Sequence, residues 1–80
     1  MVEVFKTNVT DRIHANFLTG QLHKNFIGYK VNFDLEDCDK ILRIQYTGEV
    51  INTSEVIDLM EKFGFKAEVL PDAVELIISN

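Results

Sequence analysis

The clearest pattern in the sequence is the alternation of apolar and polar residues between positions 29 and 46. Apolar side chains occupy every second position from Tyr29 to Leu35, and again from Leu42 to Tyr46. A period of two is typical of a β-strand with one face toward water. The two runs are separated by a short acidic stretch at positions 36–39. The pattern therefore predicts an antiparallel hairpin.

A second segment has apolar residues at helical spacing after position 52. Asn52 is expected as the N-cap, with Glu55 three residues later in a capping-box arrangement. Gly64 is expected just past the end of the helix, where a left-handed conformation costs glycine little. The residues that recur on one face of this predicted helix are Val56, Leu59, Met60 and Phe63.

The first helix has a weaker pattern. It is predicted from about residue 11 to about residue 24, with Thr10 as its N-cap. Ile13 and Phe17 are four residues apart and are expected to share its apolar face, whereas Leu22 lies well around the cylinder from Ile13. Gly20 weakens the helix further.

Strands at 2–7 and 65–70 complete the order strand, helix, strand, strand, helix, strand. This order predicts an α+β fold, a ferredoxin-like βαββαβ sandwich. Two helices would cover one face of a four-stranded antiparallel sheet. We expect one domain over residues 1–71 and a C-terminal extension over residues 72–80. The apolar tail from Val74 to Ile78 would form an extra strand or a short turn.

Charge and composition exclude several classes of function. The formal net charge is −5, and a net-negative surface repels phosphate backbones, so no nucleic-acid partner is expected. No apolar run approaches the ~20 residues of a membrane span, and no signal peptide is visible. Cys38 is alone, which excludes an intramolecular disulfide and fits a cytoplasmic location. The open sheet face also lacks the aromatic residues on which RNA bases stack, because it would carry Lys30, Asn32, Asp34, Arg43 and Gln45.

Three stretches resemble the heavy-metal-associated domain family, whose members include copper chaperones. They are the hairpin VNFDLEDCDKILRI, the helix exit EKFGFKAEV, and the loop TNVTDRI after the first strand. The resemblance covers about residues 3–70 and implies the fold expected above. It also implies that Phe65, the residue after Gly64, lies beside the loop that carries the metal in such domains.

Members of that family bind metal through Met-x-Cys-x-x-Cys on this loop. The resemblance places Asn8 at the methionine position, and Thr10 and Ile13 at the two cysteine positions. Copper(I) is a soft ion that thiolates bind well, whereas Thr10 offers a hard hydroxyl and Ile13 offers no ligand atom. The chain is therefore identified as a degenerate member, and no metal or other cofactor is expected.

Three residues remain as weak candidates for other metal ligands. Asp11 and His14 are close in sequence in the loop region, and Cys38 is the single thiol. We expect Cys38 in the hairpin turn, at the far edge of the fold from the first loop. No nucleophile and base pair and no Gly-rich phosphate loop is visible, so no enzymatic activity is expected.

The sequence thus predicts a non-catalytic interaction module that docks a protein partner or forms a homodimer. Its docking surface would be the loop at 8–13, and the apolar tail would add to a sheet edge of its own or a neighbouring copy. The alternative is a metallochaperone-like protein that uses Asp11, His14 and Cys38.

Overall fold

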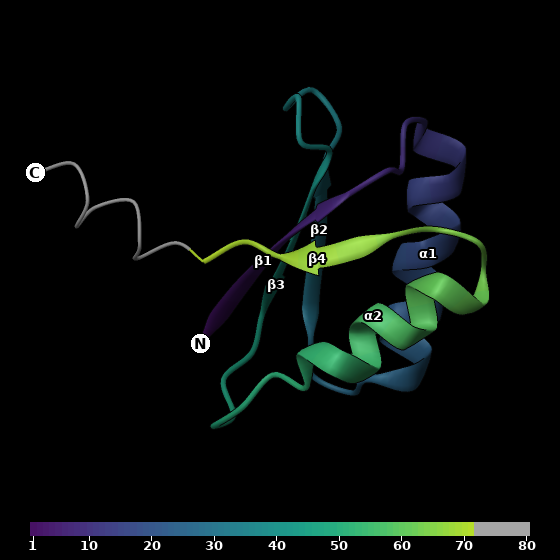
Figure 1. The fold of residues 1–80 in the computed structure, drawn as a ribbon. Helices are drawn as coiled ribbons and strands as arrows, with labels where there is room; N and C mark the ends of the chain where they lie inside the picture. The colour runs from purple at the N-terminus through teal and green to yellow at the C-terminus, as the bar shows by residue number, and fades with distance from the viewer. Residues whose placement is uncertain (72–80) are drawn as a thin grey trace, which may run out of the picture.

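The computed structural model describes residues 1–71, and Figure 1 shows the arrangement of its elements. The predicted ferredoxin-like βαββαβ fold is confirmed, with a four-stranded antiparallel sheet in the order β2-β3-β1-β4. The extension predicted for residues 72–80 lies outside the described residues. The elements are β1 (Val2–Thr7), α1 (Arg12–Asn25), β2 (Lys30–Asp34), β3 (Ile41–Gln45), α2 (Thr53–Lys62) and β4 (Ala67–Val69).

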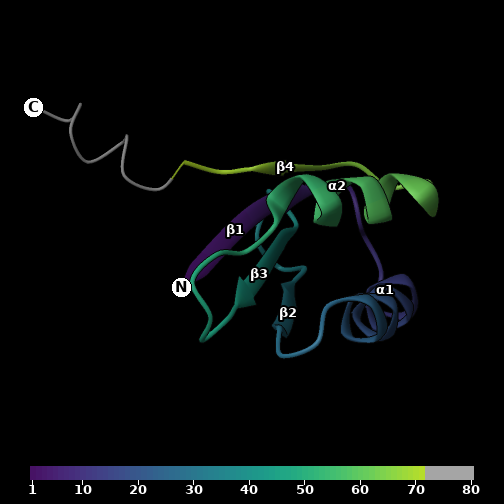
Figure 2. The same cartoon turned by 90° about the horizontal axis from the view of Figure 1, so that it is seen from below.

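Both helices lie on the same face of the sheet, as Figure 2 shows. The core fills the space between the two layers, because alternate strand residues point toward the helices. Neither helix within residues 1–71 is long and apolar enough to cross a bilayer. The side chains in the core that are fully buried are Phe5, Val9, Ala15, Leu18, Leu22, Leu42, Ile44, Val56 and Met60.

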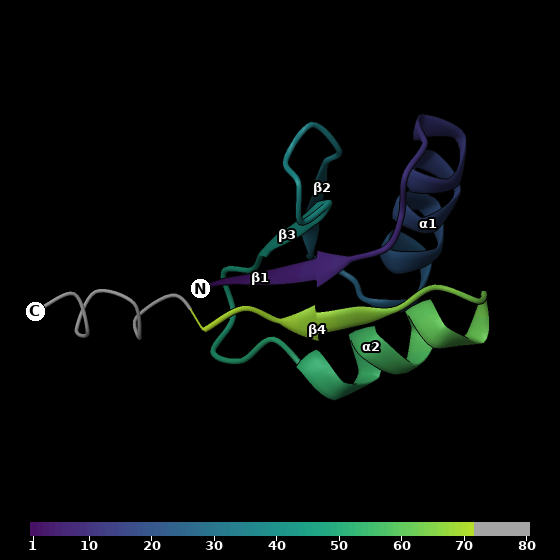
Figure 3. The ribbon, with the colours of Figure 1, turned by 45° about the horizontal axis from the view of Figure 1, so that its top comes forward.

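β1 is the strand that holds the sheet together. It pairs antiparallel with β3 from Val2 to Lys6, with Phe5 opposite Leu42. On its other side it pairs with β4, with Phe5 opposite Val69. Figure 3 shows β1 and β4 side by side, with their arrows in opposite directions.

The apolar face of α1 differs from the expected one. Its buried residues are Ala15, Leu18 and Leu22, which follow one another at spacings of three and four. Ile13 is 80% exposed and Phe17 is 47% exposed, so the face that these two residues share is not the fully buried one. Their side chains lie around the cylinder from Leu18.

The N-terminus of α2 is capped as predicted. The Asn52 side chain accepts a hydrogen bond from the Glu55 backbone N–H at 3.3 Å. The Asn52 backbone N–H, which Glu55 would satisfy in a complete capping box, donates instead to the Tyr29 hydroxyl at 3.0 Å. Gly64 has a φ of 89° just beyond the helix, as expected for the glycine that ends it.

The buried face of α1 leads to a direct prediction. Leu18→Ala should lower the free energy of unfolding by about 3 kcal/mol, because it removes a fully buried side chain and leaves a cavity. Ile13→Ala should change it by less than about 0.5 kcal/mol, because Ile13 already faces solvent. Urea denaturation monitored by circular dichroism measures both. An equal loss in the two variants would contradict this assignment of the core face.

Candidate functional site

The junction between β1 and α1, residues 8–13, is the surface that the sequence singled out. Its base is anchored by Thr7, whose buried hydroxyl donates to the Lys40 carbonyl at 2.6 Å and accepts from the Val9 backbone N–H at 3.2 Å. Val9 is fully buried in the core. One side chain therefore ties the end of β1 both to the β2–β3 connection and to the start of the loop. Sequence reasoning missed Thr7, because nothing distinguishes it from any other polar residue at a strand end.

Asn8 joins the loop to β4. Its backbone N–H donates to the Lys66 carbonyl at 3.3 Å, and its side-chain oxygen accepts from the Lys66 N–H at 2.8 Å. The position that the resemblance aligns with methionine thus carries a polar side chain that is bonded to backbone. A shallow hollow of about 300 Å³ beside this contact is also lined by Lys6, Glu61 and Glu68.

Asp11, and not Thr10, is the N-cap of α1. Its side-chain oxygen accepts a hydrogen bond from the His14 backbone N–H at 2.8 Å, so the prediction for Thr10 was wrong by one residue. Both residue types are good caps. Asp11 is favoured because its carboxylate also reaches the His14 ring, with 2.6 Å between Oδ2 and Nδ1. The hydrogen bond from the His14 N–H lowers the pKa of Asp11 below its ordinary value, and the neighbouring His14 ring acts in the same direction.

The two positions that the resemblance aligns with cysteines are open to solvent. Thr10 is exposed in the loop, and Ile13 lies in the first turn of α1 with its side chain outward. Their side chains supply a hydroxyl and a branched alkyl group. Neither is a soft ligand of the kind that copper(I) requires.

Phe65 lies against this junction, as the resemblance implied. Its ring centroid is 5.3 Å from that of His14, and the half-buried side chain packs against the core cluster. A second aromatic contact lies nearby, where the Phe17 and Phe63 rings meet edge to face at 5.1 Å. Ile13 and Phe17, in the first half of α1, are both partly or largely open to solvent.

Cys38 is exposed in the connection between β2 and β3. The expectation that this connection lies at the far edge from the loop was wrong. The Thr7 N–H donates to the Asp39 carbonyl at 3.1 Å, which places the turn beside the end of β1. The turn and the loop meet because β1 and β3 are antiparallel neighbours, so the end of β1 lies next to the start of β3.

The three candidate ligands do not form one cluster. Asp11 and His14 contact each other, while Cys38 groups with Asp37 and Asp39, with ligand atoms within 4.8 Å of one another. Within residues 1–71 this is the one group of three or more such side chains that lie this close together. It consists of consecutive residues on an exposed turn and mixes a soft thiol with hard carboxylates.

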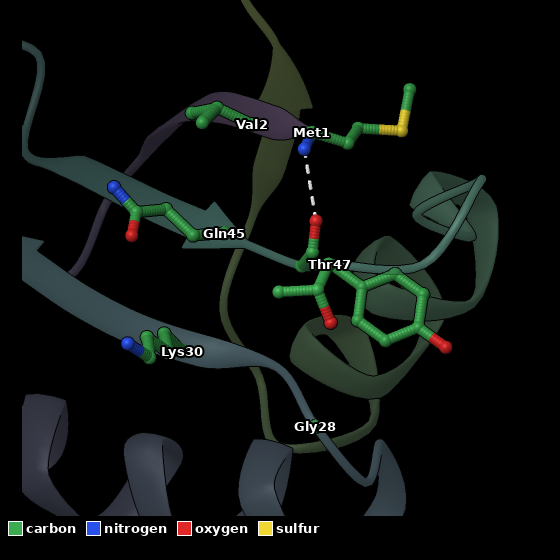
Figure 4. A pocket seen from close by; sticks show the side chains of 7 residues that line it. Met1, Val2, Gly28, Lys30, Gln45 and Thr47 are labelled. Carbon is green, nitrogen blue, oxygen red and sulfur yellow. Dashed lines mark hydrogen bonds between the residues drawn. The ribbon is translucent and has the colours of Figure 1, made fainter.

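A second hollow of about 280 Å³ lies at the opposite end of the sheet (Figure 4). There the Met1 ammonium nitrogen donates to the Tyr46 carbonyl at 2.9 Å. Val2, Lys30 and Gln45 line the same hollow. None of these side chains forms an acid–base or nucleophile–base pair.

Comparison with known proteins identifies the fold. No family model matches the sequence, and no curated protein matches it. The solution structure of the yeast copper transporter domain CCC2A, in its apo and Cu(I)-loaded states, superposes with a TM-score of 0.70. It is 22% identical, and the match covers 90% of this chain and 97% of that chain.

A structure solved in work on crosstalk between Cu(I) and Zn(II) homeostasis is also similar. It superposes with a TM-score of 0.63 at 15% identity, covering 88% of this chain and 99% of that chain. At these identities the two comparisons establish the fold. That fold is a ferredoxin-like βαββαβ architecture, and the two matches span 90% and 88% of this chain.

Asp11 should make stability depend on pH in acid. A carboxyl whose pKa is lower in the folded state than its ordinary value of 3.8 stabilises the fold above that pH. The stabilisation is lost as the pH falls through the lower, folded-state pKa. Asp11→Asn keeps a capping oxygen but does not titrate.

Thermal unfolding of the native chain and of Asp11→Asn, from about pH 6 to about pH 2, tests this contribution. We expect the native chain to be the more stable at pH 6, and the difference to shrink below pH 3.8. A difference that stays constant over the whole range would show that the Asp11 charge contributes nothing.

Proposed function

We propose that this protein is a non-catalytic interaction domain that has lost copper(I) binding from its β1–α1 loop. The observation that supports this most strongly is the chemistry of the loop. The positions that the resemblance aligns with cysteines hold Thr10 and Ile13, both open to solvent and neither able to bind a soft ion. The chain shares its fold with a copper transporter domain, and the resemblance puts Thr10 and Ile13 at the cysteine positions, which supports a site that has lost its sulfur ligands.

The loop nevertheless has the properties of a recognition surface. The side chains of Thr7, Asn8 and Asp11 bond to backbone groups of Lys40, Lys66 and His14, so the loop needs little ordering when a partner binds. Ile13 projects from it into solvent. An exposed apolar side chain on a rigid backbone is suited to contact another protein.

A metal-handling role with unusual ligands is the second candidate. The short distance between Asp11 and His14 and the position of the Cys38 turn beside β1 favour it. Against it stands the separation of these side chains into two groups. Under the first candidate, the non-catalytic interaction domain, we propose that the chain binds a protein partner or forms a homodimer, and that it is cytoplasmic.

Metal titration separates the two candidates. The native chain is titrated with copper(I) and, separately, with zinc(II), against a chelator that competes at sub-micromolar affinity. We expect no uptake of either metal, because within residues 1–71 no set of soft ligands converges on one point. Cys38→Ser is the control for metal binding by the single thiol. Sub-micromolar metal binding by the native chain that is lost in Cys38→Ser would establish the second candidate.

Restoring the missing sulfur atoms tests the position of the ancestral site. Thr10→Cys with Ile13→Cys, in the Cys38→Ser background, should bind one copper(I) ion, because two thiolates then flank the exposed junction. Each single cysteine variant is the matched control and should bind far more weakly. A folded double variant that fails to bind copper(I) would show that the loop was never the metal-carrying element.

A further inference from the structure

Within residues 1–71, no strand pairs with the outer edge of β2. In the order β2-β3-β1-β4, β2 and β4 are the two border strands, and Figure 2 shows β2 at the lower border. β4 has three residues, whereas β2 has five, Lys30–Asp34. An edge strand presents unpaired backbone N–H and C=O groups, which can pair with another chain.

The hydrogen-bond pattern shows which residues of β2 face outward. Met1 and Tyr46 exchange both backbone bonds at 2.9 Å, so Tyr46 faces β1. Alternate residues of a strand bond to opposite sides, so Gln45, Arg43 and Ile41 face β2. Their partners in the register are Lys30, Asn32 and Asp34.

Val31 and Phe33 therefore direct their backbone N–H and C=O groups away from the sheet. Within residues 1–71, no hydrogen bond from a turn, a loop or a side chain reaches these groups. Their side chains point toward the helices and pack with the core cluster. Among the described residues, the strand thus offers an unpaired backbone edge, and the side chains of Val31 and Phe33 are already packed with the core.

The sequence of β2 is self-complementary around Asn32. When two copies of Lys30–Asp34 run antiparallel about this residue, Val31 lies opposite Phe33 of the second copy. Lys30 lies opposite Asp34 of the second copy, on the open face of the sheet. In this register, Val31 and Phe33 of the second copy form a hydrogen-bonded pair, and so do Phe33 and Val31 of the second copy. These are the residues whose backbone groups face outward.

The charges of this edge are available for such a contact. The ion pairs within residues 1–71 join Lys6 to Asp39 and Asp11 to His14. Lys30 and Asp34 take part in neither. Asp34 accepts one bond from the Glu36 N–H through Oδ1, which leaves its other oxygen for a cation.

We propose that β2 is a homodimer edge, at which two copies of this chain join antiparallel about Asn32 to form one continuous sheet. A second copy of this chain is the partner that fits the strand. Under a twofold axis at Asn32, Lys30 meets Asp34 of the second copy, and the outward backbone groups of Val31 meet those of Phe33 of the second copy. This deepens the proposed interaction role by naming a partner. The dimer is tested by sedimentation and amide hydrogen exchange, whereas the loss of copper(I) binding is tested by metal titration. A failure of one proposal is therefore distinguishable from a failure of the other.

Charge reversal tests the register. Sedimentation velocity of the full chain, from about 10 µM to about 1 mM, should show a concentration-dependent dimer. Lys30→Asp or Asp34→Lys should each weaken the dimer by about 30-fold, because both cross-strand pairs change from attraction to repulsion. The double variant, Lys30→Asp with Asp34→Lys, should restore it.

Glu68→Lys is the matched control, because it changes the net charge by the same amount as Asp34→Lys on the exposed surface of the other edge strand. It should leave the dimer intact. A chain that stays monomeric throughout the series would overturn the proposal. So would a dimer that survives both single reversals, or a double variant that stays as weak as the singles.

Amide hydrogen exchange locates the interface directly. The N–H groups of Val31 and Phe33 should become protected as the concentration rises, because each gains a carbonyl acceptor from the second copy. The Asn32 N–H is the internal control, because it bonds to β3 in monomer and dimer alike. Unprotected Val31 and Phe33 amides in a sample that sediments as a dimer would place the interface elsewhere.

Discussion

β1 is hydrogen-bonded along both of its edges, to β3 on one side and to β4 on the other. This double pairing fixes where the strand ends and therefore where the chain must turn toward α1. The buried Thr7 hydroxyl completes the constraint, because it bonds to the Lys40 carbonyl and to the Val9 N–H at that point. β1 is therefore the strand that joins the β2–β3 pair to β4, and its end positions the loop at 8–13.

Hydrogen bonds within the chain hold the loop at 8–13 in place. In a metal site, ion–ligand bonds contribute to the order of the loop that holds them. Here the corresponding order comes from bonds to backbone, through Asn8 to Lys66 and through Asp11 to His14. These bonds involve side chains that carry no soft ligand, so the shape of the loop at 8–13 does not depend on thiolates.

The sequence predicted the elements with strong local signals. α2 was placed correctly because Asn52 and Gly64 mark its two ends, and because its apolar residues recur at helical spacing on one face. α1 lacks that regularity. Ile13 and Phe17 are as apolar as Leu18 and Leu22, and only packing against the sheet decides which pair is buried. The Asp11 cap was missed because Thr10 is an equally good capping residue, and the contact with the His14 ring is not visible in the sequence.

The position of Cys38 was missed for a different reason. Its turn lies beside the loop because the strand order puts β3 next to β1, and alternation along a single strand does not reveal strand order. The tertiary hydrogen bonds of Thr7 and Asn8 escaped prediction in the same way, because their partners are 33 and 58 residues away.

The sheet combines strands from two successive βαβ halves, β1-α1-β2 and β3-α2-β4, and this arrangement bears on how the domain unfolds. β1 belongs to the first βαβ half, yet both of its partners, β3 and β4, belong to the second. The Tyr29 hydroxyl of the first half also accepts the N–H of Asn52 at the start of α2. Neither half can keep its strand pairing when the other is lost, so the domain should open as a single cooperative unit, although the chain consists of two βαβ halves in succession.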